Sequence, residues 1–469
     1  MAGIFGSVAK KGDCAQSLYY GIDYHCHLGT DYAGMAVFGK KGIERKIHDI
    51  RGDNFRPKFQ QDYGKMKGKY GIGVIGYDIQ PVVFSSRHGV FSIVMNGNIV
   101  NLDAIVGKLL NQGSNFAEIQ PDASISPAEI VAELISKADN LELGLASIYD
   151  YIQGSASVLL LTRDGIFAAR DRMGHSTLVI GESDNGYAVT TETTAFPNLG
   201  FSVLAELAPG EIVKITEQGI ERRREGNRAA AHPCAFLWVY TSFPATSVEG
   251  INVEKARYNS GASLARRDKA AGFSADIVAG VPDSGVGHAI GYANESGIPY
   301  ARPIVKYTPS WPRSYMPSDQ SVRDLIANMK LIAIPELIRG KRIVICDDSI
   351  VRGPQLRKMI TEKLLAHGAK EVHLRIACPP LMFPCIYNQS TRTTKELAAR
   401  RAIRLLEGKD TQEVAEYLDR KSPKHEKMVA AIASELGANS LMYQALEDMA
   451  AAIGRPVEGI CKYCWMGRA

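Results

Sequence analysis

The stretch KRIVICDDSIVRG (341–353) decides the architecture of the second half of the chain. Its first six residues are mostly apolar and β-branched, a composition typical of a buried strand. After the polar residues, Pro354 suits the first position of a helix and Gly368 suits its end. Runs at 275–281 and 371–380 are also typical of strands. Strand and helix therefore alternate, which predicts an α/β domain built on a parallel sheet.

The polar residues of this stretch suit a phosphate and a cation. Asp347 and Asp348 stand at the carboxyl end of the expected strand, where ligands bind in parallel sheets. Residues 349–353 lead into the helix, and free N–H groups at a helix N-terminus favour a phosphate. Adjacent carboxylates can hold sugar hydroxyls or Mg2+. Asp and Ser are also ordinary helix-capping residues, but the complete run VICDDSIVRG favours the binding interpretation.

Length and composition bound the remaining possibilities. The 469 residues are enough for two or three domains. A hydrophobic content of 45% excludes a mainly disordered chain. The net charge of +5, without a dense basic run, argues against a nucleic-acid partner. No apolar run is long enough to span a bilayer, and the N-terminus lacks the features of a signal peptide. We therefore expect a cytoplasmic protein without a membrane partner.

The first half has a different pattern. Short β-branched segments broken by Gly, Asn and Asp predict mostly β structure, with helices near 12–22 and 127–138. Asn96-Gly97 lies between apolar runs and predicts a hairpin turn, because a type I′ turn needs positive φ. The polar segment 226–233 is a candidate linker, so we expect two domains that cover 1–230 and 231–469.

Several motifs together resemble those of one enzyme family. Residues 344–353 resemble the phosphoribosyl-diphosphate (PRPP) loop of type I phosphoribosyltransferases. VPDSG (281–285), GYANESGIPY (291–300), APGE (208–211) and CKYCWMG (461–467) extend the resemblance over nearly the whole chain. The chain is similar to the glutamine PRPP amidotransferase family of purine synthesis. This implies an N-terminal four-layer αββα sandwich of the N-terminal-nucleophile (Ntn), class II glutamine amidotransferase type. The second domain would be a type I phosphoribosyltransferase domain with a parallel sheet and a helical, cluster-bearing tail.

The resemblance also implies a PRPP site. Asp347 and Asp348 would hold the ribose hydroxyls, and Ser284 would face Mg2+ together with both aspartates. The 5-phosphate would be cradled by the five residues Ser349, Ile350, Val351, Arg352 and Gly353.

A flexible loop that closes on PRPP is expected at 313–331. Lys330 in this loop matches a family lysine, whereas Asn328 replaces a basic residue. Pro354 and Gln355 replace two threonines that usually continue the phosphate loop. We therefore expect PRPP chemistry with a weakened phosphate contact.

The glutamine site departs from the family at several positions at once. The family's nucleophile is an N-terminal cysteine, and thiolate chemistry needs sulfur; Ala2 stands there in this chain. Gly76 stands where the family has an arginine for the glutamine carboxylate, and Pro127 where it has an aspartate for the substrate amine. Leu28 replaces another family arginine. These joint departures favour a natural loss of glutaminase activity over a single engineered substitution.

Asn96 and Gly97 match the oxyanion donors of the family. Without acyl transfer to stabilise, we favour their interpretation as a hairpin turn. The expected function is that of a pentosyltransferase in which ammonia or another amine displaces pyrophosphate from PRPP. The alternative is a non-catalytic paralogue that binds PRPP or a nucleotide effector and regulates a partner. The family also implies a homo-oligomer, a dimer or tetramer.

Eight cysteines are too few for a disulfide scaffold in a chain of this length, so metal or catalytic roles are considered first. The spacing Cys461-x-x-Cys464 indicates metal, and Cys234 and Cys385 lie in segments that resemble those of the family's iron–sulfur subclass. Four thiolates suit either a [4Fe–4S] cluster or zinc, and the resemblance favours the cluster. Buried packing is expected for the other four, Cys14, Cys26, Cys346 and Cys378.

Overall fold

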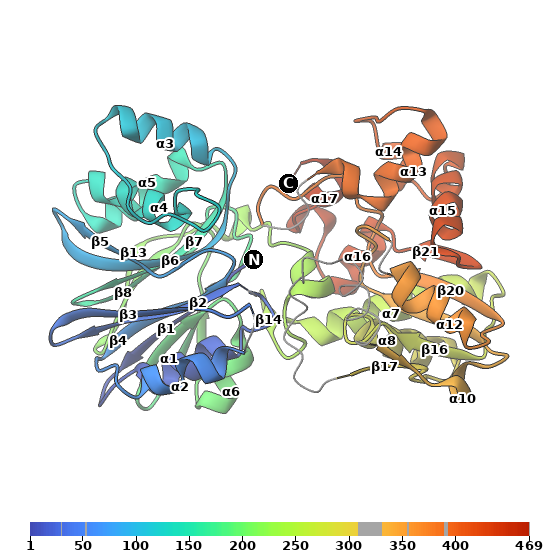
Figure 1. Ribbon diagram of the computed structural model, residues 1–469, viewed down its shortest axis with the longest axis horizontal. Coiled ribbons are helices and arrows are strands. Elements are labelled where there is room, and N and C mark those ends of the chain that lie inside the picture. The colour runs from blue at the N-terminus through green and yellow to red at the C-terminus, as the bar shows by residue number, and fades with distance from the viewer. Residues whose placement is uncertain (30, 52–53, 308–330, 354–355, 389–392, 469) are drawn as a thin grey trace. The chain divides into compact units, whose positions relative to one another are not determined.

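The computed structural model of the protein is shown in Figure 1. It describes residues 1–29, 31–51, 54–307, 331–353, 356–388 and 393–468. The chain forms two compact units. The first comprises Met1–Pro233, Ala245–Glu249 and Ile386–Gln389, and the second comprises Cys234–Pro244, Gly250–Cys385 and Ser390–Ala469. Two short segments from the second half of the chain thus belong to the first unit, which the sequence analysis does not anticipate.

Two antiparallel sheets form the centre of the first unit. In the described residues, one sheet has the order β11 (Ser202–Glu206), β9 (Val179–Ser183), β10 (Gly186–Thr190), β1 (Gly3–Ala9), β4 (Tyr70–Gly76), β2 (Tyr32–Gly39) and β3 (Gly42–Asp49). The other has the order β13 (Gly219–Arg224), β12 (Ile212–Thr216), β8 (Gly165–Ala169), β7 (Gly154–Thr162), β6 (Gly89–Ile99) and β5 (Val82–Ser86).

Helices cover the outer faces of both sheets, as Figure 1 shows. The first sheet carries α1 (Ala15–Asp23), α2 (Phe55–Tyr63) and α6 (Phe196–Leu199). The second carries α3 (Leu102–Asn111), α4 (Pro127–Lys137) and α5 (Leu141–Tyr151). Strand β7 contains the run Val158–Leu161, which is wholly buried because it packs on the other sheet and on helices. The expected αββα sandwich is confirmed.

The expected hairpin turn at Asn96-Gly97 is wrong. Both residues lie inside β6, where Asn96 pairs with Ser157 and Gly97 with Ala156 on β7. Gly97 does have a positive φ of 148°. A Cβ added there would lie 2.0 Å from the carbonyl oxygen of Ser155, so glycine is required by close strand approach.

A parallel sheet forms the centre of the second unit. Its described strands run in the order β16 (Ile277–Gly280), β19 (Arg342–Asp347), β20 (Glu371–Ile376) and β21 (Ser440–Tyr443). All three neighbouring pairs are parallel, as the strand–helix alternation predicts. Strand β21 lies in the tail that was expected to be helical, so this part of the expectation is wrong. A short antiparallel pair, β17 (Ile304–Lys306) and β18 (Leu331–Ala333), stands apart.

The helices α7 (Val253–Ala270) and α8 (Val286–Ser296) pack closely beside this sheet. A Cβ added at Gly261 on α7 would lie 1.8 Å from the carbonyl oxygen of His288, and one at Gly291 would lie 1.9 Å from that of Tyr258. Glycine therefore lets the two helix backbones touch, which fixes the start of α8 next to the carboxyl end of β16.

Most of the remaining regular structure in the second unit is helical. After β19, the segment Arg357–Thr361 forms a π-helical turn that continues into α12 (Glu362–Ala366). The other helices are α10 (Pro335–Ile338), α13 (Ala398–Glu407), α14 (Ala415–Leu418), α15 (Pro423–Leu436), α16 (Leu446–Ile453) and α17 (Tyr463–Met466). In the ranges that the structure describes, no helix is long and apolar enough to cross a membrane.

Candidate functional site

Three residues predicted to bind Mg2+ come together at the carboxyl end of the parallel sheet. Asp347 is the last residue of β19, and Ser284 lies in the turn between β16 and α8. The Ser284 hydroxyl donates a hydrogen bond to Asp347 Oδ1 at 2.7 Å, and the backbone N–H of Asp348 donates to the same oxygen at 3.0 Å. The Ser349 hydroxyl donates to Asp348 Oδ2 at 2.5 Å. The side-chain oxygen atoms that follow two neighbouring strands thus lie close together.

Both carboxyl groups are buried, with relative exposures of 7% for Asp347 and 5% for Asp348. Burial raises the pKa of each, and the neighbouring Asp348 charge raises the pKa of Asp347 further. Two adjoining buried carboxylates are unfavourable unless a cation or hydroxyl donors compensate them. Their oxygen chemistry fits Mg2+ and the ribose hydroxyls.

The segment 349–353 follows directly and is held from one side. Ile350 is buried, the Val351 carbonyl accepts a hydrogen bond from the Ala398 N–H at 2.8 Å, and Gly353 has φ of 83°. The Arg352 guanidinium pairs with Glu396 at 2.8 Å. The Arg352 side chain therefore binds a protein carboxylate, as the Ser349 hydroxyl does, and any phosphate contact by the loop would be made by backbone N–H groups. Lys330, Asn328, Pro354 and Gln355 lie outside the described residues.

The four cysteines predicted to be ligands all lie in the second unit, and their thiols influence one another. We call Cys234, Cys385, Cys461 and Cys464 the thiol site. The backbones of Cys234 and Cys461 pair in an isolated parallel β-bridge. The Cys464 carbonyl accepts hydrogen bonds from the backbone N–H groups of Met382 and Phe383 at 2.9 and 3.0 Å. These contacts bring three distant segments of the chain together.

The thiols affect one another electrostatically. Burial raises the pKa of Cys234, and so do the nearby Cys461 and Cys385. The pKa of Cys464 is raised by its hydrogen bond with Cys385, by burial and by the other thiols. A positively charged metal centre would reverse this by stabilising thiolates, and the donor set of four thiols fits an iron–sulfur cluster or zinc. Among the residues described, no three His, Cys, Asp or Glu side chains already stand in a metal-holding arrangement.

The predicted glutamine-site positions Ala2 and Gly76 also adjoin, in the first unit. The Ala2 N–H donates to Asn96 Oδ1 at 2.9 Å. A Cβ added at Gly76 would lie 3.0 Å from Ala2 Cβ, and one added at Gly29 would lie 2.4 Å from the Gly76 nitrogen. Ala2 and Gly29 therefore lie close to the last residue of β4. Pro127 is the first residue of α4.

Polar residues near the N-terminus have partners that the sequence analysis missed. His25 is fully buried beneath Gly3 and bonds the Gly21 carbonyl at 2.8 Å and the Thr190 hydroxyl at 2.9 Å. Burial lowers the pKa of His25 to about 4, so it is a neutral core histidine near neutral pH. His27 Nε2 lies 2.9 Å from the buried Glu192 carboxylate. No motif indicates Glu192, which lies two residues after β10, the strand whose Thr190 pairs with Phe5 of β1.

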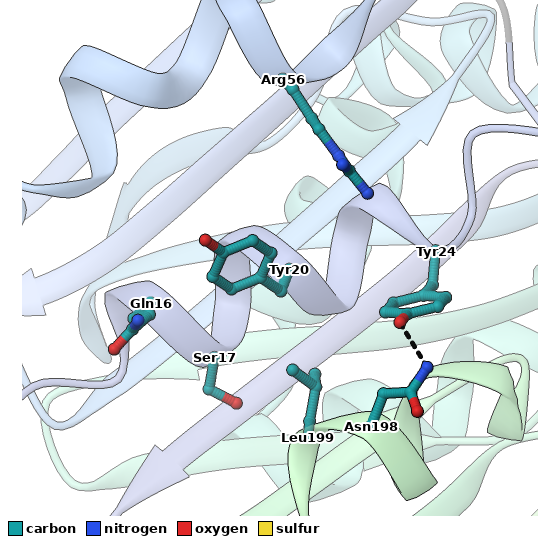
Figure 2. Close-up of a pocket in the computed structure, with 7 residues that line it drawn as sticks. All are labelled: Gln16, Ser17, Tyr20, Tyr24, Arg56, Asn198 and Leu199. Carbon is teal, nitrogen blue, oxygen red and sulfur yellow. Dashed lines mark hydrogen bonds between the residues drawn. The ribbon is translucent and has the colours of Figure 1, made fainter.

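A surface hollow of about 520 Å³ in the first unit is lined by none of the predicted site residues. Figure 2 shows its lining residues, Gln16, Ser17, Tyr20, Tyr24, Arg56, Asn198 and Leu199. The Arg56 guanidinium pairs with Asp23 at 2.7 Å, and Asn198 Nδ2 donates to the Tyr24 hydroxyl at 2.6 Å. Because these polar groups bind one another, we assign no ligand to this hollow.

Comparisons with known proteins agree with this geometry. A family model described as a glutamine amidotransferase domain matches residues 72–198. The amidophosphoribosyltransferase of Bacillus subtilis is 32% identical, over 99% of this chain and 93% of its own length. The chain belongs to the amidophosphoribosyltransferase family. The family member of Methanocaldococcus jannaschii is 31% identical, over 100% of this chain and 97% of its own.

Solved structures of amidophosphoribosyltransferases share the fold. The B. subtilis glutamine PRPP amidotransferase complexed with ADP and GMP has a TM-score of 0.84 at 31% identity, with 99% of this chain and 96% of that chain covered. A structure described as the allosteric regulatory enzyme of purine biosynthesis also has a TM-score of 0.84, at 30% identity, with 100% and 96% covered. The two-domain fold class expected from the sequence is thus confirmed.

Proposed function

We propose that this chain is a Mg2+- and PRPP-dependent phosphoribosyltransferase of purine synthesis that lacks glutaminase activity and uses ammonia or another amine. The observation that carries the proposal is the contrast between two sites. The buried carboxyl groups of Asp347 and Asp348 and the partly buried hydroxyl of Ser284 place oxygen atoms close together near the strand ends. At the other site, the methyl group of Ala2 packs against Gly76.

The proposed transfer depends on positioning and charge. Asp347 and Asp348 would orient the ribose through its hydroxyls, and the N–H groups of 349–353 would hold the 5-phosphate. The amine nitrogen forms a bond to C1 of the ribose as the bond from C1 to the pyrophosphate oxygen breaks, and the excess proton of the amine leaves. When bound by Ser284, Asp347 and Asp348, Mg2+ would offset the charge of the departing pyrophosphate. Holding both reactants in place supplies the remaining advantage.

The residues at the expected glutamine site lack the groups that glutamine hydrolysis needs. An alanine methyl cannot attack an amide carbon, and neither Gly76 nor Pro127 carries a charge for the carboxylate or amine of glutamine. The Asn96 oxygen accepts a hydrogen bond from the Ala2 N–H, and its amide nitrogen has no partner in the described residues, so this donor alone does not supply a nucleophile. Free ammonia, or an amine made elsewhere, would therefore have to reach the second unit.

We further propose that the thiol site holds a [4Fe–4S] cluster with a structural role. Its ligands come from residues 234, 385 and 461–464, so a bound cluster would link segments that are far apart in the sequence. Linking such segments restricts the unfolded chain, as a covalent cross-link does. Zinc at the same four cysteines is the alternative that metal analysis would identify.

Assembly and regulation complete the proposal. We propose a homo-oligomer, a dimer or tetramer, in keeping with the family resemblance. A nucleotide effector is also proposed, because the B. subtilis relative is described as complexed with ADP and GMP.

The test is to incubate purified protein with PRPP, Mg2+ and ammonia and to measure pyrophosphate release. Release that depends on both Mg2+ and ammonia is expected. PRPP binding without release, with ammonia and with a panel of primary amines, would overturn the transferase and indicate a binding paralogue.

A further inference from the structure

We propose that Arg401, on α13, is a positioning residue that fixes loop 349–353 in the shape required to bind a phosphate. This inference rests on the proposed function, in which that loop holds the 5-phosphate of PRPP. Arg401 itself does not contact the substrate in this proposal; it acts through the backbone of the loop.

Arg401 joins the loop to two other segments. Its Nη2 donates to the Arg352 carbonyl at 2.7 Å and to Glu435 Oε1 on α15 at 2.6 Å. Its Nη1 donates to the Glu396 carbonyl at 2.9 Å. One planar guanidinium thus connects the loop, the turn before α13, and α15, which a flexible ammonium group does less well.

Other contacts hold the same side of the loop. The N–H of Ala398, at the start of α13, donates to the Val351 carbonyl at 2.8 Å. The Arg352 side chain pairs with Glu396, and a Cβ added at Gly353 would lie 3.6 Å from Arg401 Nη2. The segment from Glu396 to Arg401 therefore donates hydrogen bonds to two successive loop carbonyls, those of Val351 and Arg352.

This arrangement has a consequence for phosphate binding. When the Val351 and Arg352 carbonyls are bonded to α13, carbonyl oxygens, which repel anions, are held toward the helix. In the described ranges, the hydrogen bonds from the loop backbone to α13 use carbonyls and leave the loop N–H groups to a ligand. A loop already in its binding shape loses less conformational freedom when a ligand binds.

An ordinary surface ion pair is the competing explanation. The side chains of Arg401 and Glu435 are 30% and 38% exposed, and an ion pair at such a location contributes little to stability. The two backbone carbonyls that Arg401 also binds distinguish it from such a pair. A surface pair alone would leave PRPP affinity unchanged when removed.

The test uses Arg401→Gln in the full chain, with Arg404→Gln as matched control. Arg404 lies on the same helix, is 28% exposed, pairs with Asp410 at 3.1 Å and donates to the Lys395 carbonyl, outside loop 349–353. Two quantities are measured: the Kd for PRPP with Mg2+ by calorimetry, and amide hydrogen exchange of loop peptides without ligand.

We expect Arg401→Gln to raise the Kd about tenfold and to speed exchange in the loop, because a charge-assisted hydrogen bond and the preformed shape are lost. The PRPP Kd and the loop exchange rate of Arg401→Lys should lie between those of the wild type and Arg401→Gln. Both quantities should be the same in Arg404→Gln as in the wild type. Equal PRPP affinity and equal loop exchange in Arg401→Gln and the wild type would overturn this inference alone. Wild-type protein that binds no PRPP would overturn the proposed function, and this inference with it.

Discussion

The N-terminal positions and the phosphate-loop segment differ in why their residues stand where they do. Near Ala2, Gly97 matches the family and has a structural reason, because a Cβ added there would lie 2.0 Å from the Ser155 carbonyl oxygen. At the end of β19, Asp347 and Asp348 remain although burying adjoining carboxylates is unfavourable. Residues that the fold requires persist whether or not a site works, whereas unfavourable buried charges indicate function.

The largest effect is expected when the two carboxyl groups before the phosphate loop are removed. Asp347→Asn combined with Asp348→Asn should abolish measurable PRPP binding, since charge-assisted hydrogen bonds of about 1.5–3 kcal/mol each are lost with the cation ligands. The fold should survive, because two buried charges become neutral. Calorimetry with PRPP and Mg2+ measures the affinity, and thermal unfolding serves as the control. Unchanged affinity would mean that this segment is only a capped helix start.

A metal-linked change comes next. Cys464→Ser should remove the metal and release the C-terminal tail to protease, while peptides of the first unit stay protected. Loss of such a link costs about 2–5 kcal/mol by analogy with a disulfide. Cys378→Ser, at a buried cysteine outside the thiol site, is the control for losing a thiol. Iron and sulfide should be present in anaerobically purified wild-type protein. About one zinc per chain without iron would show that the thiol site binds zinc and not a cluster. If the anaerobic protein contained neither iron nor zinc, the proposal that the thiol site binds a metal would be wrong.

Gly97→Ala tests whether the N-terminal residues persist for the fold. It should lower the free energy of unfolding of the first unit by about 2–4 kcal/mol, because the added Cβ collides with the Ser155 carbonyl. Gly113→Ala is the control: its φ of 84° is also positive, but nothing lies within 4 Å of the added Cβ. Denaturant unfolding compares the two. Equal effects would contradict the packing explanation.

The smallest expected effect is the most specific. Ala2→Cys restores the family's nucleophile but not the charges at Gly76 and Pro127, so glutamine should still bind poorly. Glutamate release from glutamine should stay at the wild-type background after Met1 is removed from both proteins. A large increase would show that the pocket still binds glutamine and that only the nucleophile is missing.

The sequence predicted local units well and contacts between distant segments poorly. The strand, the aspartates and the following turn were predictable because hydrophobic pattern and loop chemistry are local. Asn96-Gly97 misled because positive φ serves a close strand approach as well as a turn. Strand β21 is only Ser440–Tyr443, too short to stand out within a helical tail. The Arg401 contacts cannot be predicted, since they depend on how α13 and α15 pack beside the loop.

The most direct measurement supplies PRPP and Mg2+ with two nitrogen sources, unlabelled ammonia and glutamine labelled with ¹⁵N in its amide. The labelled nitrogen in the phosphoribosylamine product is then determined by mass spectrometry at an early time. The proposed function predicts product that contains ammonia nitrogen only, at a rate that does not change when glutamine is omitted. Product that carries the glutamine label would contradict the proposal that this family member has lost its glutaminase.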